Sequence, residues 1–141
     1  MGQNIFHLVF RTKNNLKFFR QDYIRDHCEQ FLCEAADRHG IGIYCMRILP
    51  DHVHLFVELP PTLSVSCAVK YLKGYSSRKF FQVYTIWRGI VRKWYKCAHL
   101  WSRWRFSRSV GSVRADIIEN YILNSTHNQF SAYKDNQTKL Q

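Results

Sequence analysis

Long apolar runs and paired cysteines are both missing from this chain of 141 residues. No stretch reaches the roughly 18 consecutive apolar residues that a membrane-spanning helix requires, and the first residues lack the basic-then-apolar order of a secretory signal. The five cysteines are scattered, and none forms a Cys-x-x-Cys pair. This pattern argues against a disulfide framework and against a cysteine zinc site. We therefore expect a cytosolic protein with buried, reduced thiols and no membrane partner.

Acidic residues are missing from residues 70–108, which we call the basic segment. It holds 11 of the 21 Lys and Arg residues and no Asp or Glu, so the other 10 basic residues balance all 10 acidic ones. The whole formal charge of +11 therefore lies in the basic segment. A solvated surface usually mixes both signs of charge, whereas a surface of one sign can neutralise phosphates.

Tyrosine and tryptophan residues alternate with these basic residues and offer flat surfaces on which bases can stack. We therefore favour nucleic acid as the partner of the basic segment. The residues that we expect to contact DNA are Lys70, Lys73, Arg78, Lys79, Arg88, Arg92, Lys93, Arg103 and Arg105. An anionic membrane surface is the alternative, and it would favour a clean amphipathic basic helix.

Two histidines lie on a predicted strand over residues 52–59. Aliphatic residues occupy alternate positions there, and His52 and His54 lie between them. Because the side chains of a strand point alternately to its two faces, both imidazoles should emerge together, opposite the aliphatic face. Two neutral imidazoles can hold one ion and leave its other positions to substrate oxygens. Taken alone, however, a His-x-His pair more often marks a half-exposed strand.

The remaining chain predicts alternating strands and helices. The predicted strands span residues 5–11, 41–49, 52–59 and 104–109. The predicted helices span residues 21–39, a stretch that follows Thr62 or Ser64, and residues 112–128, with a loop and some helix over 83–100. This order is typical of an α+β fold, the ferredoxin-like or RRM-like split β-α-β sandwich, in which two helices cover a four-stranded antiparallel sheet. We expect one domain over residues 1–128 and a polar tail over 129–141.

Tyr121 is the candidate nucleophile, and it lies on the predicted last helix. Ser125 and Asn128 follow it by four and seven residues and therefore share its helical face. A packing tyrosine with its hydroxyl at the surface is the alternative, and the residue pattern alone favours that alternative.

Four segments together resemble the HUH-class transposases of the TnpA type, which carry a single catalytic tyrosine and mobilise small insertion sequences as single-stranded DNA. The segments are residues 50–56 (Pro-Asp-His-Val-His-Leu-Phe), 72–78 (Leu-Lys-Gly-Tyr-Ser-Ser-Arg), 100–101 (Leu-Trp) and 121–122 (Tyr-Ile). They follow one another in the order of the family and span nearly the whole chain.

The resemblance implies an endonuclease and strand transferase. His52 and His54 would hold Mg²⁺ or Mn²⁺ against the scissile phosphate, and Tyr121 would attack it. The products would be a 5′-phosphotyrosyl enzyme and a free 3′-hydroxyl, which can later rejoin DNA without ATP. Relatives commonly carry a glutamine four residues after the tyrosine, where this chain has Ser125. The third metal ligand is therefore open, with Ser125 and Asn128 as candidates and Asn124, His127 or a water as alternatives.

The family also implies particular partners. Its members bind DNA hairpins at the element ends and act as homodimers, in which the tyrosine helix of one subunit can complete the histidine site of the other. Two further functions remain open. A non-catalytic binder of single-stranded nucleic acid would use the charge and aromatics but leave the histidines idle. A hydrolytic two-histidine metalloenzyme acting on a small phosphate substrate would give no reason for the basic segment.

Overall fold

The computed structural model describes residues 4–96 and 98–110. The elements, in chain order, are β1 (Ile5–Thr12), a 3₁₀ turn η1 (Lys13–Asn15), α1 (Asp22–Arg38), β2 (Gly42–Leu49), β3 (His52–Glu58), α2 (Val65–Val83), α3 (Thr85–Tyr95) and β4 (Trp101–Ser109). Every strand expected from the sequence is present. The predicted helix 112–128 and the tail 129–141 lie outside the described residues.

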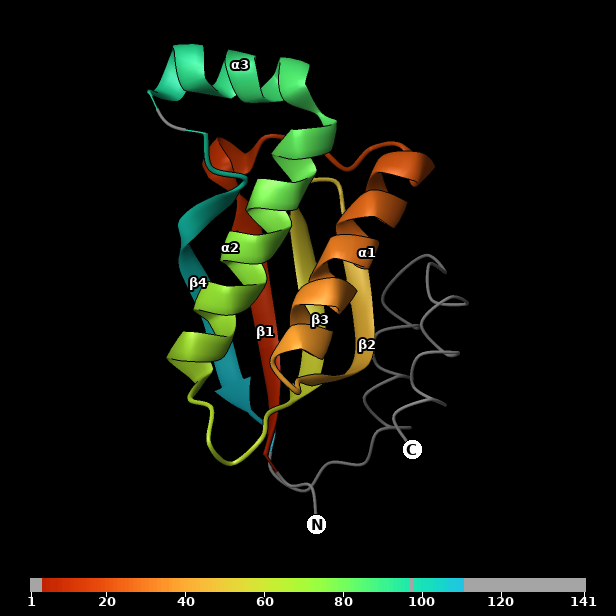
Figure 1. Ribbon diagram of the computed structural model, residues 1–141, viewed down its shortest axis with the longest axis vertical. Helices are drawn as coiled ribbons and strands as arrows, with labels where there is room; N and C mark the ends of the chain where they lie inside the picture. Colours follow the sequence, from red (N-terminus) through yellow and green to blue (C-terminus); the bar gives the residue numbers. More distant parts are fainter. Residues whose placement is uncertain (1–3, 97, 111–141) are drawn as a thin grey trace.

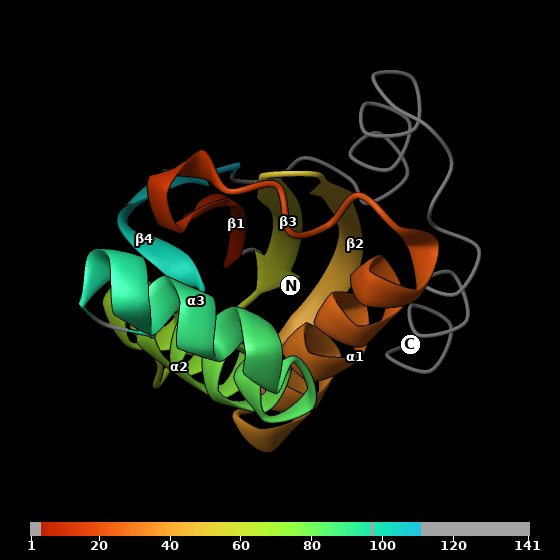
Figure 2. The same ribbon diagram turned by 90° about the horizontal axis from the view of Figure 1, so that it is seen from above.

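The four strands form one antiparallel sheet in the order β2-β3-β1-β4. Helices α1 and α2 pack side by side across one face of this sheet (Figures 1 and 2). The predicted split β-α-β sandwich is therefore confirmed for the described residues. Because β3 alternates, the helices cover Val53, Leu55 and Val57, which are fully buried, and the two histidines lie on the opposite face.

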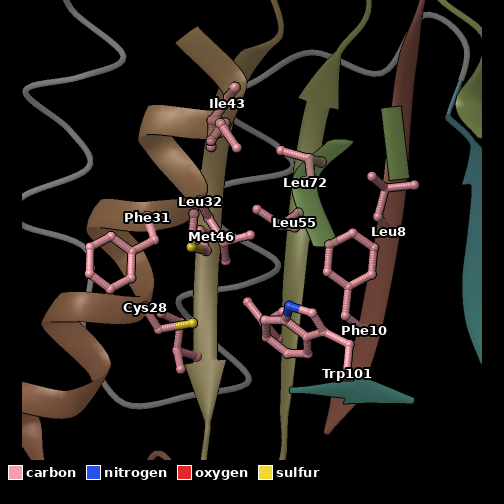
Figure 3. Packing of buried hydrophobic residues seen from close by; sticks show 14 of the residues in the cluster. Leu8, Phe10, Cys28, Phe31, Leu32, Ile43, Met46, Leu55, Leu72 and Trp101 are labelled. Carbon is pink, nitrogen blue, oxygen red and sulfur yellow. The ribbon is translucent and has the colours of Figure 1, made fainter. Parts of the chain in front are cut away.

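The core lies between this face of the sheet and the two helices. Figure 3 shows Leu8 and Phe10 of β1 beside Leu55 of β3 and Leu72 of α2, and all four are fully buried. Cysteines also contribute, since Cys28 and Cys45 are buried. The expectation of buried thiols is wrong for Cys67, which is exposed. Cys67 lies in the first turn of α2, outside the apolar stripe that faces the sheet.

Helix α2 begins where the sequence predicts. The Ser64 hydroxyl accepts a hydrogen bond from the Cys67 backbone N–H at 3.1 Å and so caps the first turn. Gly74 does not interrupt the helix. Strand β4, in contrast, begins at Trp101, three residues before the predicted start.

A third helix, α3, occupies most of residues 83–100, where the sequence predicted a loop with some helix, and it crosses the end of α2 (Figure 1). Its apolar residues recur at helical spacing and form one broad stripe, which comprises Ile86, Trp87, Ile90, Val91 and Trp94. Trp87 and Val91 pack inward, whereas Ile86 is 78% exposed and Trp94 is 69% exposed. The spacing alone could therefore have predicted this helix, although only part of the stripe is buried.

Candidate active site and nucleic-acid interface

His52 and His54 form a pair on the face of β3 that the helices leave uncovered. Their ring centroids lie 5.1 Å apart. His52 Nδ1 lies 2.8 Å from a carboxylate oxygen of Asp51, and His54 Nδ1 lies 3.1 Å from Nε2 of His7. Within the described residues, each ring is therefore held through Nδ1 and can offer Nε2 to a ligand. The predicted common face for the two imidazoles is confirmed.

Electrostatics keep the His54 ring neutral. Burial, together with the charges of His52, His7, Arg47 and Arg11, lowers the pKa of His54 to about 4. The hydrogen bond from His52 lowers the pKa of the Asp51 carboxyl. That carboxylate accepts the Nδ1–H of His52, so the lone pair of this ring lies on Nε2. A neutral imidazole with a free lone pair is the form that binds metal.

His7 is a functional candidate that the sequence reasoning did not name. It lies on β1, opposite Phe56 of β3, and its ring stacks on the Phe56 ring with centroids 4.4 Å apart. If His54 binds a ligand through Nε2, its Nδ1 carries the proton and donates it to His7 Nε2, so His7 carries its own proton on Nδ1. The apolar alternation of Phe6, Leu8 and Phe10 in the predicted strand 5–11 shows that His7 points to the opposite side, but its contact with His54 depends on the pairing of β1 with β3.

Guanidinium groups flank the pair on two neighbouring strands. Arg11 of β1 lies opposite His52, and Arg47 of β2 lies opposite His54. A third, Arg108 of β4, lies opposite His7, and its charge adds to burial in lowering the pKa of His7. We call this surface, with His52, His54 and these three arginines, the histidine face. Its positive charge suits an anionic ligand.

Tyr121, Ser125 and Asn128 lie outside the described residues, so their distances from the histidine pair are not part of the structure. Within residues 4–96 and 98–110, no group of three or more His, Cys, Asp or Glu side chains is arranged to hold a metal. The described part of the chain thus brings together two imidazoles, and a metal there would need further ligands.

A basic groove lies on the other side of the sheet, between α2, α3 and β4, and has a volume of about 1220 Å³. None of the described residues that line it is acidic. Its basic lining residues are Lys13, Lys70, Lys73, Arg78, Arg88, Arg92, Arg103 and Arg105. Seven of the nine residues expected to contact DNA are thus brought together, while Lys79 and Lys93 lie outside the lining.

Lys73 differs from the other basic residues of the groove. Its ammonium donates hydrogen bonds to the backbone carbonyls of Ser102 at 2.9 Å and Trp104 at 3.1 Å. Burial, with the charge of Arg105, lowers its pKa to about 8. Lys73 therefore holds β4 against α2, in addition to lining the groove. This role depends on tertiary contacts that the sequence pattern does not show.

Two serines of the segment 72–78 also fasten β4 to α2. The Ser76 hydroxyl donates to the carbonyl of Leu72 at 2.6 Å and accepts the indole N–H of Trp101 at 2.9 Å. The Ser77 hydroxyl accepts the backbone N–H of Leu100 at 3.1 Å. These bonds explain the early start of β4, because they order the chain directly before and at Trp101.

Among the described helices, none is long and apolar enough to cross a membrane.

The family model for IS200-like transposases matches residues 2–125, which is most of the chain. The chain belongs to this family. The resemblance drawn from the histidine, serine and tyrosine segments is therefore confirmed.

Named relatives and solved structures agree with this assignment. The ISDra2 transposase TnpA of Deinococcus radiodurans is 30% identical over 79 residues, which cover 56% of this chain and 56% of that protein. The transposase of insertion sequence IS200 from Salmonella typhimurium is 28% identical over 117 residues, which cover 83% of this chain and 73% of that protein. The chain thus spans little more than half the length of the ISDra2 relative.

Two solved structures share the fold of this IS200-like transposase. A crystal structure of a putative transposase from Deinococcus radiodurans has a TM-score of 0.68 at 23% identity, covering 88% of this chain and 92% of that one. A REP-associated tyrosine transposase bound to a REP hairpin has a TM-score of 0.55 at 11% identity, covering 99% of this chain and 72% of that one. At these identities the likeness concerns the fold.

Proposed function

We propose that this protein is a metal-dependent transposase that cuts and rejoins single-stranded DNA at hairpin-marked element ends through a phosphotyrosine intermediate. One observation carries the proposal. His52 and His54 share a positively charged face of the sheet, and each is held through Nδ1 so that Nε2 is available. Two histidines that merely lay on a half-exposed strand would not require hydrogen bonds that orient both rings in this way.

The donor set fits a divalent cation that shares its coordination with substrate oxygens. Two neutral imidazoles would hold Mg²⁺ or Mn²⁺ through Nε2, and the hydrogen bonds at Nδ1 are the outer contacts that usually orient metal-binding histidines. When bound, such an ion polarises a phosphate oxygen. Ser125 and Asn128 stay candidates for a third ligand from the chain.

Tyr121 is the proposed nucleophile. Its phenol oxygen loses a proton and attacks the phosphorus, and the bond from phosphorus to the 3′-oxygen breaks. The leaving 3′-oxygen takes up a proton and becomes a hydroxyl, while the 5′-phosphate stays on the tyrosine. Only about one tyrosine in a thousand is ionised at neutral pH, so the positively charged surroundings would favour the phenolate. Because the covalent link conserves the bond energy, the same step in reverse joins DNA.

The basic groove is the proposed site of the hairpin. Its described lining combines cationic side chains with no carboxylate, which favours phosphate binding. The relative of the same fold that was solved with a REP hairpin supports a hairpin as the ligand. We further propose that the protein works as a homodimer, in which Tyr121 acts on the histidine pair of its own or of the partner subunit, in the cytoplasm.

The test is an incubation of the protein with labelled single-stranded DNA from the ends of its own element and Mn²⁺. We expect a covalent protein–DNA adduct, which disappears in Tyr121→Phe and in His52→Ala/His54→Ala, while hairpin binding persists in both variants. Hairpin binding without any adduct would indicate the non-catalytic binder instead. Turnover that does not depend on Tyr121 would indicate a hydrolytic metalloenzyme.

A further inference from the structure

Arg47, in the middle of β2, is the one charged side chain among the described residues that is buried. Only 4% of its surface is exposed, and its Nε and Nη1 atoms have no hydrogen-bond partner in the described part of the chain. A guanidinium stays charged in proteins, so leaving it buried without a partner carries a large desolvation penalty. Such a group calls for an explanation, and a bound anion that supplies the missing acceptor is one.

The position of Arg47 indicates which ligand that is. It lies directly opposite His54 in the β2–β3 ladder, and residues in such pairs point to the same face of a sheet. The positive charge of Arg47 contributes to the lowered pKa of His54. Arg11 lies opposite the other histidine, His52, on the neighbouring strand. The histidine pair is thus flanked by a guanidinium on each side.

The carboxylates described on this face have other partners. Asp51 is hydrogen bonded to His52. Glu58, at the other end of β3, accepts the Tyr44 hydroxyl at 2.6 Å. Neither is bonded to Arg47, whose free N–H groups therefore call for an acceptor from outside the described chain.

We propose that Arg47 binds a phosphodiester oxygen of the single-stranded DNA that lies along the histidine face, and so positions that strand against His52 and His54. This inference rests on the proposed function for the identity of the ligand. It assigns Arg47 to the strand to be cut, whereas the arginines of the basic groove serve the hairpin.

The test compares two DNA probes taken from the element end: the hairpin alone, and the hairpin with its short single-stranded flank. Both are titrated without added metal onto protein that carries Tyr121→Phe, so that no cleavage intervenes. We expect Arg47→Met to bind the flanked hairpin about tenfold more weakly than the parent does. The slope of log affinity against log salt should become shallower by about 0.7, the value for one phosphate of a single strand. Affinity for the hairpin alone should not change.

Two further variants sharpen the comparison. Arg88→Met, in the basic groove, is the matched control and should weaken binding of both probes equally. Arg47→Lys keeps the charge and should retain part of the flank affinity. An Arg47→Met protein that binds both probes as the parent does would overturn the inference.

Thermal unfolding without DNA separates ligand binding from an internal role. If DNA supplies the acceptor, Arg47→Met removes an unpaired buried charge, and the melting temperature should rise or stay constant. A lower melting temperature with unchanged flank affinity would instead show that Arg47 neutralises a carboxylate of the chain itself, which would refute the inference. These assays need no cleavage, so they test the role of Arg47 even if no covalent adduct forms. An adduct that forms although Arg47→Met binds normally would refute the role of Arg47 and leave the proposed function intact.

Discussion

The two histidines of β3 are held by different partners, although they lie two residues apart. His52 is held by the carboxylate of Asp51, the residue before it, whereas His54 is held by His7, which lies 47 residues away on β1. The first contact is local and could be expected from the Asp-His-x-His segment. The second depends on the pairing of β1 with β3 and needed the structure. Both leave the same ring nitrogen available.

Removal of the His7 Nε2 acceptor should weaken metal binding by the histidine pair. In His7→Phe the ring can still stack on Phe56, but nothing accepts the Nδ1 proton of His54. We expect about tenfold weaker Mn²⁺ binding to the DNA-free protein, as is typical for the loss of an outer contact of a metal-binding histidine. Isothermal titration calorimetry measures this. His39→Phe is the matched control, because His39 stacks on Tyr71 and does not contact the pair. Equal affinity in both variants would mean that His7 does not orient His54.

The low pKa of His54 should also appear in the stability of the metal-free protein. Its pKa is about 4 in the folded chain, against an ordinary value of 6.5. Below 6.5 the unfolded chain binds a proton that the folded chain does not, so the contribution of His54 is fully present above pH 6.5 and is lost as the pH falls to about 4. After allowance for the half-exposed ring, we expect a loss of about 1 to 2 kcal/mol.

Urea unfolding at several pH values across this window checks the prediction. The free energy of unfolding should fall less steeply in His54→Gln than in the parent protein, because the glutamine cannot titrate. Curves of the same steepness in both proteins would show that His54 has an ordinary pKa in the folded state.

At the scale of elements, the attachment of β4 to α2 decides where the edge strand begins. Ser76 is buried, and it joins the indole of Trp101 to the carbonyl of Leu72. Ser76→Ala would leave the Trp101 N–H buried without an acceptor. We expect a loss of about 2 kcal/mol in the free energy of unfolding, measured with chemical denaturant.

A double variant tests that explanation. Adding Trp101→Phe to Ser76→Ala removes both partners of the bond. The stability losses of the two single variants should therefore sum to clearly more than the loss measured for the double variant. Ser102→Ala, at the exposed side of β4, is the control and should cost under about 0.5 kcal/mol. Strictly additive effects would mean that the hydrogen bond contributes little.

Some of these elements were easier to predict from the sequence than others, for physical reasons. Strands β1 to β3 and helix α1 each bury one apolar face, and alternation or helical spacing reveals such a face directly. Helix α3 also carries its apolar residues at helical spacing and could have been predicted from it, although much of that stripe is exposed. Strand β4 has a mostly exposed pattern in which Trp104 and Phe106 are not buried. The histidine pair followed from alternation alone. His7 and Arg47 became apparent only when the strands were paired.

At the scale of the molecule, the basic groove and the histidine face lie on opposite sides of the sheet. Arg105 of β4 lies opposite the buried Phe10 and lines the groove, whereas the neighbouring Phe106 contacts His7 on the other side. Because β4 is the edge strand, a hairpin in the groove can send its single-stranded flank past β4 to the histidines. Trp104, 82% exposed, is two residues from Phe106 on β4 and so points to the same side of the sheet as the histidines, where we expect the flank to pass.

Trp104→Ala should therefore weaken binding of the flanked hairpin more than binding of the hairpin alone. A lost base stack on an aromatic ring costs about 1 to 3 kcal/mol, which is roughly a tenfold or greater loss of affinity. Fluorescence anisotropy with the two probes measures the difference. Trp94→Ala provides the comparison, since Trp94 is also exposed but lies on α3. If both tryptophan variants behave alike, the flank takes another route.

The account as a whole requires that the DNA be joined to one particular side chain. The most direct measurement is therefore peptide mass spectrometry of the denatured product after incubation with single-stranded element-end DNA and Mn²⁺. We predict a nucleotide attached through its 5′-phosphate to Tyr121, and no such peptide from His52→Ala/His54→Ala. Cleaved DNA without a modified peptide, or a nucleotide on any other residue, would contradict the account.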